Sequence, residues 1–159
     1  MGTGKPQVAI LMAVYEPDLE WFRTQLRSLN GQTYPNLCLY IRDDASTKVP
    51  FQVIQSCIQD CITAFPVFLW RNEENMGSNR TFQRLTQEAE GDYFAYCDQD
   101  DVWLPEKVET LVAKLESCRA ALACSDVTVI DADGRQIADS ITALRPRHIF
   151  RSGEGLAGE

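Results

Sequence analysis

Residues 93–101 read YFAYCDQDD, a short apolar run that ends in a dense acidic cluster. Within that cluster, three carboxylates in four residues (98–101) repel one another, so crowding them together costs free energy. A predicted strand that ends in this way indicates a site for a cation. When only two or three protein oxygens hold a divalent cation, phosphate oxygens commonly fill its open positions.

The alternation of apolar runs and polar breaks continues on both sides of this stretch. Val8–Val14 is continuously apolar without helical polarity, which predicts a strand buried on both faces. Apolar residues then recur at spacings of three and four from Leu19 to Leu29, which predicts a helix. The same criteria predict strands over 37–42, 67–70, 93–96 and 121–130, helices over 50–62, 78–90 and 105–115, and a hairpin at Asp133-Gly134 that returns through 135–138.

This order of strands and helices predicts an α/β fold with a mostly parallel sheet and helices on both of its faces. Ligands of such sheets bind outside the carboxyl ends of the strands. That rule selects three polar segments, namely residues 13–16, 43–47 and 98–101. We therefore expect these segments, which lie far apart in sequence, to converge on one edge of the sheet.

Composition bounds the class of protein. The chain has 159 residues, 45% of them hydrophobic, which suits one compact domain with its own core. The net charge of −8 and the absence of a basic block argue against nucleic-acid binding. The apolar run Val8–Tyr15 is too short to span a bilayer, and no signal-peptide cleavage site follows it. We expect a cytoplasmic protein, peripheral at the inner face of the membrane in its full-length form.

The six cysteines offer no metal site of the usual spacing. No C-x-x-C pair occurs, and the single His148 cannot complete a zinc set. We interpret the cysteines as buried, reduced thiols.

Each polar segment has a functional and a structural interpretation. Tyr15 can stack on a nucleobase or fill a gap between sheet and helix. Asp44, within the segment 43–46, can accept a hydrogen bond from a base or ribose, or cap a turn. Asp98 and Asp100 can hold Mg²⁺ or Mn²⁺ directly or through water, or belong to a solvated loop in which Asp101 caps the next helix.

The segment 75–80, NMGSNR, precedes a predicted helix. Gly77 permits close approach of a ligand to the backbone. Arg80 can reach a diphosphate, or it can be an ordinary exposed helix arginine.

Taken together, these motifs resemble the family 2 inverting glycosyltransferases, which have a GT-A type fold. The resemblance runs from Val8 to about Asp139, and its last motif, at 97–105, is especially similar to that of bacterial rhamnosyltransferases of cell-surface polysaccharides. The motifs that carry it are AVYE (13–16), LRSLNGQTY (26–34), IRDDAST (41–47), NMG (75–77), GDY (91–93) and CDQDDVWLP (97–105).

The resemblance implies a nucleotide-sugar site and a metal. Asp44 would meet the base, Asp98 would lie near the ribose and diphosphate, and Asp100 would be the main metal ligand of a D-x-D signature. The metal would be Mn²⁺ or Mg²⁺, with Asp98 as a second ligand. The full set of implied nucleotide-sugar-binding residues is Ala13, Val14, Tyr15, Glu16, Asp44, Gly77, Arg80, Asp98 and Gln99.

The resemblance also implies partners and a division of the chain. We expect residues 7–140 to form the donor-binding domain, and 141–159 to be a tail or the start of an acceptor-binding half. Relatives place the catalytic base in that later half. Because this sequence stops at Glu159, we expect it to hold the donor-binding half, and we nominate no residue as the catalytic base. The expected donor is a UDP- or dTDP-linked sugar, and the expected acceptor is a polysaccharide or lipid-linked glycan. A homodimer is a further expectation, because half of such a fold would expose apolar surface.

One residue departs from this pattern, and two other classes of protein stay open as alternatives. Thr81 stands where close relatives often carry Asn. A sugar-nucleotide nucleotidyltransferase would show a Gly-rich, basic loop after the first strand, where this chain has Tyr15-Glu16-Pro17. A non-catalytic nucleotide-binding or assembly module is the third alternative.

Overall fold

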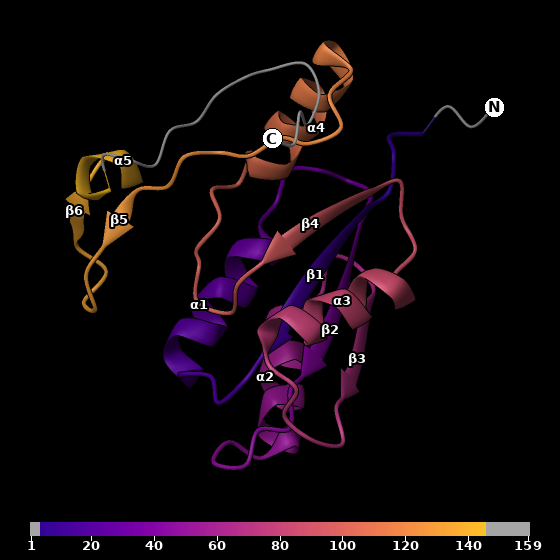
Figure 1. Ribbon diagram of the computed structural model, residues 1–159, viewed down its shortest axis with the longest axis vertical. Helices are drawn as coiled ribbons and strands as arrows, with labels where there is room; N and C mark the ends of the chain where they lie inside the picture. Colours follow the sequence, from indigo (N-terminus) through magenta and orange to yellow (C-terminus); the bar gives the residue numbers. More distant parts are fainter. Residues whose placement is uncertain (1–3, 146–159) are drawn as a thin grey trace, which may run out of the picture. The chain divides into compact units, whose positions relative to one another are not determined.

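A four-stranded parallel sheet forms the centre of the fold in the computed structural model, which describes residues 4–145. Its strand order is β3 (Val67–Arg71), β2 (Leu37–Asp43), β1 (Val8–Val14) and β4 (Tyr93–Cys97). All three neighbouring pairs are parallel, so the carboxyl ends of the strands meet at one edge, as Figure 1 shows. The α/β class and the first four predicted strands are confirmed.

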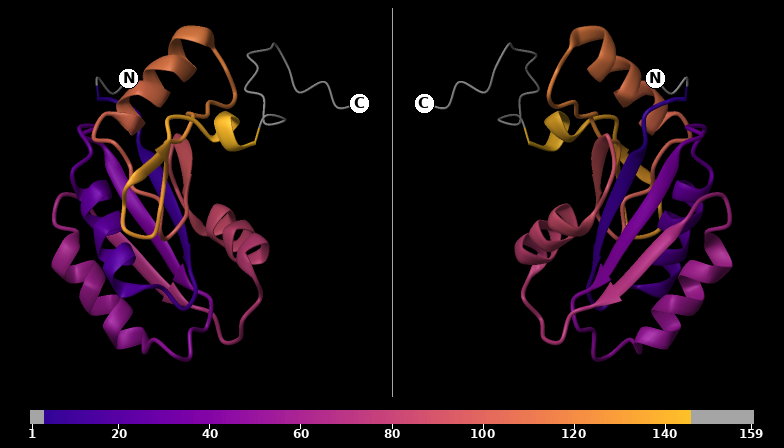
Figure 2. Two further views of the ribbon diagram at one scale, coloured as in Figure 1. Left: turned by 90° about the vertical axis from the view of Figure 1, so that its left-hand side faces the viewer. Right: turned by 90° about the vertical axis from the view of Figure 1, so that its right-hand side faces the viewer.

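Helices cover both faces of this sheet (Figure 2). On one side lie α1 (Leu19–Asn30) and α2 (Phe51–Cys61), and on the other lies α3 (Ser78–Glu88). Asp18 begins α1, because its carboxylate accepts the backbone N–H groups of Glu20 and Trp21. The apolar face that the sequence predicts for α1 is buried.

The helix α3 packs on the middle of the sheet. Leu85 of α3 belongs to one buried cluster with Ala9 and Leu11 of β1 and with Tyr40 of β2. This packing places the amino end of α3 near the carboxyl ends of β1 and β2, where ligands of parallel sheets bind.

The chain divides into two compact units, residues 1–109 and 110–159, and α4 (Lys107–Cys118) crosses the division. The second unit contains β5 (Val129–Ile130), β6 (Gln136–Ala138) and α5 (Ile141–Leu144). β5 and β6 form a separate antiparallel pair. In the turn between them, the Gly134 N–H donates a hydrogen bond to Asp131 O, and Gly134 has a φ of 78°. The predicted hairpin is confirmed.

The prediction of a strand over the whole of 121–130 as a fifth member of the main sheet is wrong. Only Val129–Ile130 is a strand, and it pairs with β6 instead. The apolar residues of the segment find no buried position, as Leu122 at 73% exposure shows. Of the segment 141–159, expected to be a tail or the start of an acceptor-binding half, residues 146–159 lie outside the described residues.

Four of the six cysteines are buried and free, as predicted, but Cys118 and Cys124 are exposed. Both belong to the second unit, residues 110–159, in which Val112 is the one described residue that is buried. No helix in residues 4–145 combines the length and the apolar character needed to cross a membrane.

Candidate nucleotide-sugar site

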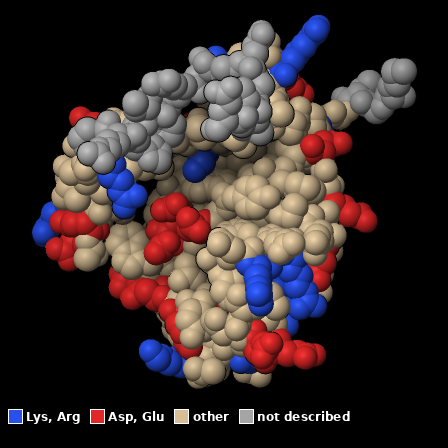
Figure 3. Space-filling model, viewed as in Figure 1, with Lys and Arg blue, Asp and Glu red and all other residues tan. Residues whose placement is uncertain are grey.

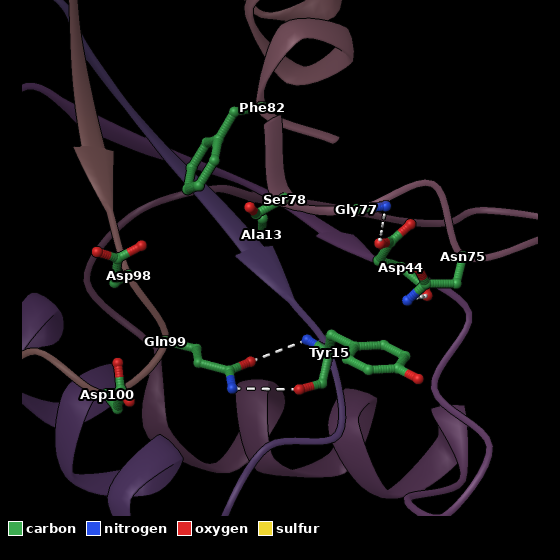
Figure 4. Close-up of a pocket in the computed structure, with 10 residues that line it drawn as sticks. All are labelled: Ala13, Tyr15, Asp44, Asn75, Gly77, Ser78, Phe82, Asp98, Gln99 and Asp100. Atoms are coloured by element: carbon green, nitrogen blue, oxygen red, sulfur yellow. Dashed lines mark hydrogen bonds between the residues drawn. The ribbon is translucent and has the colours of Figure 1, made fainter. Parts of the chain in front are cut away.

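An open pocket of about 470 Å³ lies at the carboxyl ends of β1, β2 and β4. It is lined by Ala13, Tyr15, Asp44, Asn75, Gly77, Ser78, Phe82, Asp98, Gln99 and Asp100 (Figure 4). The three segments that the sequence selects therefore do converge. The space-filling view shows a compact group of acidic side chains near the middle of this face, with basic side chains close by (Figure 3).

Three predicted site residues do not line the pocket. The Val14 side chain is fully buried in the sheet, Glu16 directs its carboxylate to another loop, and Arg80 is exposed on α3. Three lining residues were not predicted, namely Asn75, Ser78 and Phe82. Ser78 and Phe82 lie four residues apart at the start of α3, so a helical reading of the segment after Gly77 would have placed both on one face.

Tyr15 forms the wall of the pocket at the end of β1. Its side chain is 48% exposed, which leaves ring surface open to a ligand. Two hydrogen bonds from the side chain of Gln99 hold its backbone. The Tyr15 N–H donates to Gln99 Oε1 at 2.9 Å, and Gln99 Nε2 donates to Tyr15 O at 3.2 Å.

Glu16 anchors the loop that leads into α2. Its carboxylate accepts the backbone N–H groups of Thr47, Lys48 and Val49 and the hydroxyl of Thr47. These bonds, the one from Lys48 foremost, lower the pKa of Glu16 to about 2. The carboxylate is thus committed to the protein.

Asp44 anchors the loop between β3 and α3. Its carboxylate is 2% exposed and accepts Asn72 Nδ2 at 2.7 Å, the Met76 N–H at 2.9 Å and the Gly77 N–H at 2.8 Å. Burial alone would raise the pKa of Asp44, but these hydrogen bonds outweigh it and the pKa is lowered. Gly77, at φ 84°, adopts a conformation that favours glycine and leads directly into α3.

The acidic loop after β4 contrasts with these two anchors. Asp98 and Asp100 are exposed, and neither carboxylate makes a hydrogen bond or ion pair with another described residue. The pKa of Asp101 is raised by burial first and then by the charges of Asp98 and Asp100, while Lys107 partly offsets this.

This donor set fits a hard divalent cation, because oxygen ligands with uncompensated negative charge suit Mg²⁺ and Mn²⁺. In residues 4–145 no group of three or more His, Cys, Asp or Glu side chains is arranged to hold a metal by itself. A cation at Asp98 and Asp100 would therefore keep positions open for the oxygens of a ligand.

Comparison with known proteins gives consistent results. The model of the family described as "Glycosyl transferase family 2" matches residues 9–156. An uncharacterized glycosyltransferase of Methanocaldococcus jannaschii, MJ1057, is 26% identical over 82% of this chain and 44% of its own length. The dTDP-rhamnosyl transferase RfbG of Shigella flexneri is 25% identical over 79% of this chain and 44% of its own length. The chain spans about half or less of the length of these relatives.

Solved structures share the fold. The mannosyltransferase PcManGT of Pyrobaculum calidifontis, in complex with GDP-Man and Mn²⁺, has a TM-score of 0.65 at 19% identity over 81% of this chain and 37% of that one. S. aureus TarS 1–349, in complex with UDP-GlcNAc, has a TM-score of 0.61 at 15% identity over 88% of this chain and 47% of that one. These likenesses confirm the GT-A type fold. Because the family match extends over most of the sequence, this chain belongs to glycosyl transferase family 2.

Proposed function

We propose that this chain carries the donor-binding part of an enzyme that transfers a sugar from a nucleotide-diphospho-sugar to an acceptor hydroxyl. One observation carries the proposal: the pocket joins an exposed aromatic ring at one wall to two uncommitted carboxylates at the other. A base and a diphosphate are the two ends of a nucleotide-sugar that need these groups. The family supports sugar transfer, and the two solved neighbours hold GDP-Man and UDP-GlcNAc.

At the end of the pocket that would hold the nucleobase, the binding surface is formed by residues of this chain. Tyr15 stacks on the nucleobase, and the small side chain of Ala13 leaves room beside it. Asp44 borders this end, where it holds the loop that carries Asn75 and Gly77. Val14 and Glu16 contribute by fixing the end of β1 rather than by touching the nucleotide. Arg80 takes no part, because it does not line the pocket.

At the diphosphate end, Asp98 would lie near the ribose, and Asp100 would be the main ligand of Mn²⁺ or Mg²⁺, with Asp98 as the second. A bound divalent cation supplies Lewis-acid stabilisation of the leaving diphosphate. Asp98 and Asp100 suit that role because no described side chain neutralises them.

The proposed reaction is a single displacement. The acceptor hydroxyl oxygen attacks the anomeric carbon as the bond to the diphosphate oxygen breaks, so the configuration inverts. The acceptor hydroxyl proton passes to a base to which we assign no described residue. The proposed donors are UDP- or dTDP-linked sugars and the acceptors cell-surface polysaccharides or lipid-linked glycans, with the protein cytoplasmic or peripheral at the inner face of the membrane.

Titration with nucleoside diphosphates tests this proposal. We expect the protein to bind UDP or dTDP more tightly with Mn²⁺ than without it, by calorimetry. Asp100→Ala should remove the gain due to Mn²⁺, a loss on the order of 10-fold or more, as is common when metal sites are disturbed. Asp60→Ala, at an exposed position of α2, is the matched control and should bind like the wild type. A folded sample that binds none of the nucleoside diphosphates would refute the donor site.

A further inference from the structure

The pairing of β4 with β1 stops before the pocket is reached. The last paired residues are Met12 and Cys97, after which the chain turns away into the acidic loop. The end of β1 nevertheless stays tied to that loop, because the side chain of Gln99 reaches Tyr15, two residues beyond Ala13. Figure 4 shows both hydrogen bonds.

The side chain of Gln99 here takes the place of a peptide group. A neutral amide carries both an acceptor and N–H donors, so it can satisfy an N–H and a C=O of the same neighbouring residue. Gln99 does this at Tyr15, with distances of 2.9 and 3.2 Å. The result continues the ladder between β1 and the chain after β4 by one further step.

This tie connects the two ends of the pocket. Tyr15 belongs to the base end, and the flanking Asp98 and Asp100 belong to the metal end. Figure 4 shows the two aspartates on either side of Gln99. The two hydrogen bonds to Tyr15 fix the orientation of the amide and leave one N–H donor and one oxygen lone pair of Gln99 for a ligand in the pocket it lines.

We infer that Gln99 is a positioning residue whose amide holds the backbone of Tyr15 and the acidic loop in one arrangement, so that the base end and the metal end of the site form together. This inference rests on the proposed donor site, and it adds a positioning role to the nucleotide-sugar contact that the resemblance implies for Gln99. Its consequence is energetic coupling between nucleotide binding and metal binding.

The coupling is measured with Gln99→Met, which keeps the length of the side chain but neither donates nor accepts a strong hydrogen bond. Dissociation constants for UDP are determined by calorimetry with and without Mn²⁺. We expect the factor by which Mn²⁺ tightens UDP binding to fall by about 3- to 10-fold, as expected for the loss of one or two exposed hydrogen bonds. The control is Gln55→Met, at an exposed position of α2, in which the factor should not change.

A second measurement needs no nucleotide. In the unliganded protein, hydrogen exchange of the Tyr15 amide is followed by NMR, and we expect it to accelerate in Gln99→Met and not in Gln55→Met. Unchanged exchange would overturn the tie itself. If the wild type binds UDP and the Mn²⁺ factor is the same in Gln99→Met, the coupling is overturned while the donor site stands. If the wild type binds no nucleoside diphosphate, the proposed function fails, and the exchange measurement still decides whether Gln99 holds Tyr15.

Discussion

The loops after β2 and after β4 have similar compositions and opposite uses. Each follows a parallel strand at the same edge of the sheet, and each begins with an aspartate, Asp44 after β2 and Asp98 after β4. In the β2 loop Asp44 is buried and accepts three hydrogen bonds, whereas in the β4 loop Asp98 and Asp100 are exposed and uncommitted. A buried carboxylate needs hydrogen-bond partners from the protein, because burying an unpaired charge is costly. An exposed carboxylate is solvated by water and stays free to bind a ligand.

The difference has an electrostatic counterpart. The pKa of Asp44 is lowered, so its ionised form stabilises the fold, while the pKa of Asp101 is raised, so its ionised form opposes folding. The β2 loop thus contributes stability, and the β4 loop keeps charge at some cost to stability.

The largest expected effect comes from Asp44→Ala. This change leaves the N–H groups of Met76 and Gly77 and the amide of Asn72 without their acceptor, so we expect a loss of about 3 kcal/mol in the free energy of unfolding. Urea unfolding at pH 7 measures it. The loss should shrink as the pH falls below the ordinary aspartate pKa of 3.8. Because the pKa of Asp44 is lowered in the folded state, its carboxylate contributes its full stability above 3.8 and loses that contribution as it becomes protonated at lower pH.

Asp98→Ala is the matched control for this comparison. We expect it to change the free energy of unfolding by less than about 0.5 kcal/mol, because an exposed side chain without protein partners is removed. Equal losses in the two variants would show that the loops do not differ in the way described.

A smaller effect is expected from Glu16→Gln, which tests whether the committed carboxylates of this edge stabilise the fold through their charge. The lowered pKa of Glu16 means that its contribution is complete above the ordinary value of 4.5 and is lost as the pH falls toward about 2. Glu16→Gln should therefore be less stable than the wild type at pH 7 and approach it over that interval, in unfolding followed by circular dichroism. A Glu16 difference independent of pH would count against the assignment.

The smallest expected effect has the opposite sign. Asp101→Asn removes a charge whose folded-state pKa is raised, so it should stabilise the protein at pH 7 by no more than about 0.5 kcal/mol, since solvent screens exposed charges. The gain should disappear below pH 3.8, where the wild-type carboxyl is also protonated, and it should diminish in high salt. Destabilisation by Asp101→Asn at neutral pH would contradict the assignment of an unfavourable charge to Asp101, by burial first and by the charges of Asp98 and Asp100 second.

Much of the fold could be predicted from local patterns. Val8–Val14 is a buried strand because no polar residue interrupts it, and α1 begins after Asp18 because that residue caps it. The segment 121–130 misled the prediction, because an apolar run predicts a strand only where a partner and a core are available. The residues next to Leu122 in the sequence do not determine whether it finds such a partner.

The sequence by itself determined the succession of strands and helices, and with it the edge at which residues 13–16, 43–47 and 98–101 meet, because parallel strands bring their carboxyl ends together. Only the tertiary structure decided which polar side chains at that edge are committed to the protein. The bonds that commit Asp44, Glu16 and Gln99 join residues separated by 32, 31 and 84 positions. Such contacts depend on where distant loops come to lie, so a local motif can nominate a polar residue for a site but cannot distinguish an anchor from a ligand.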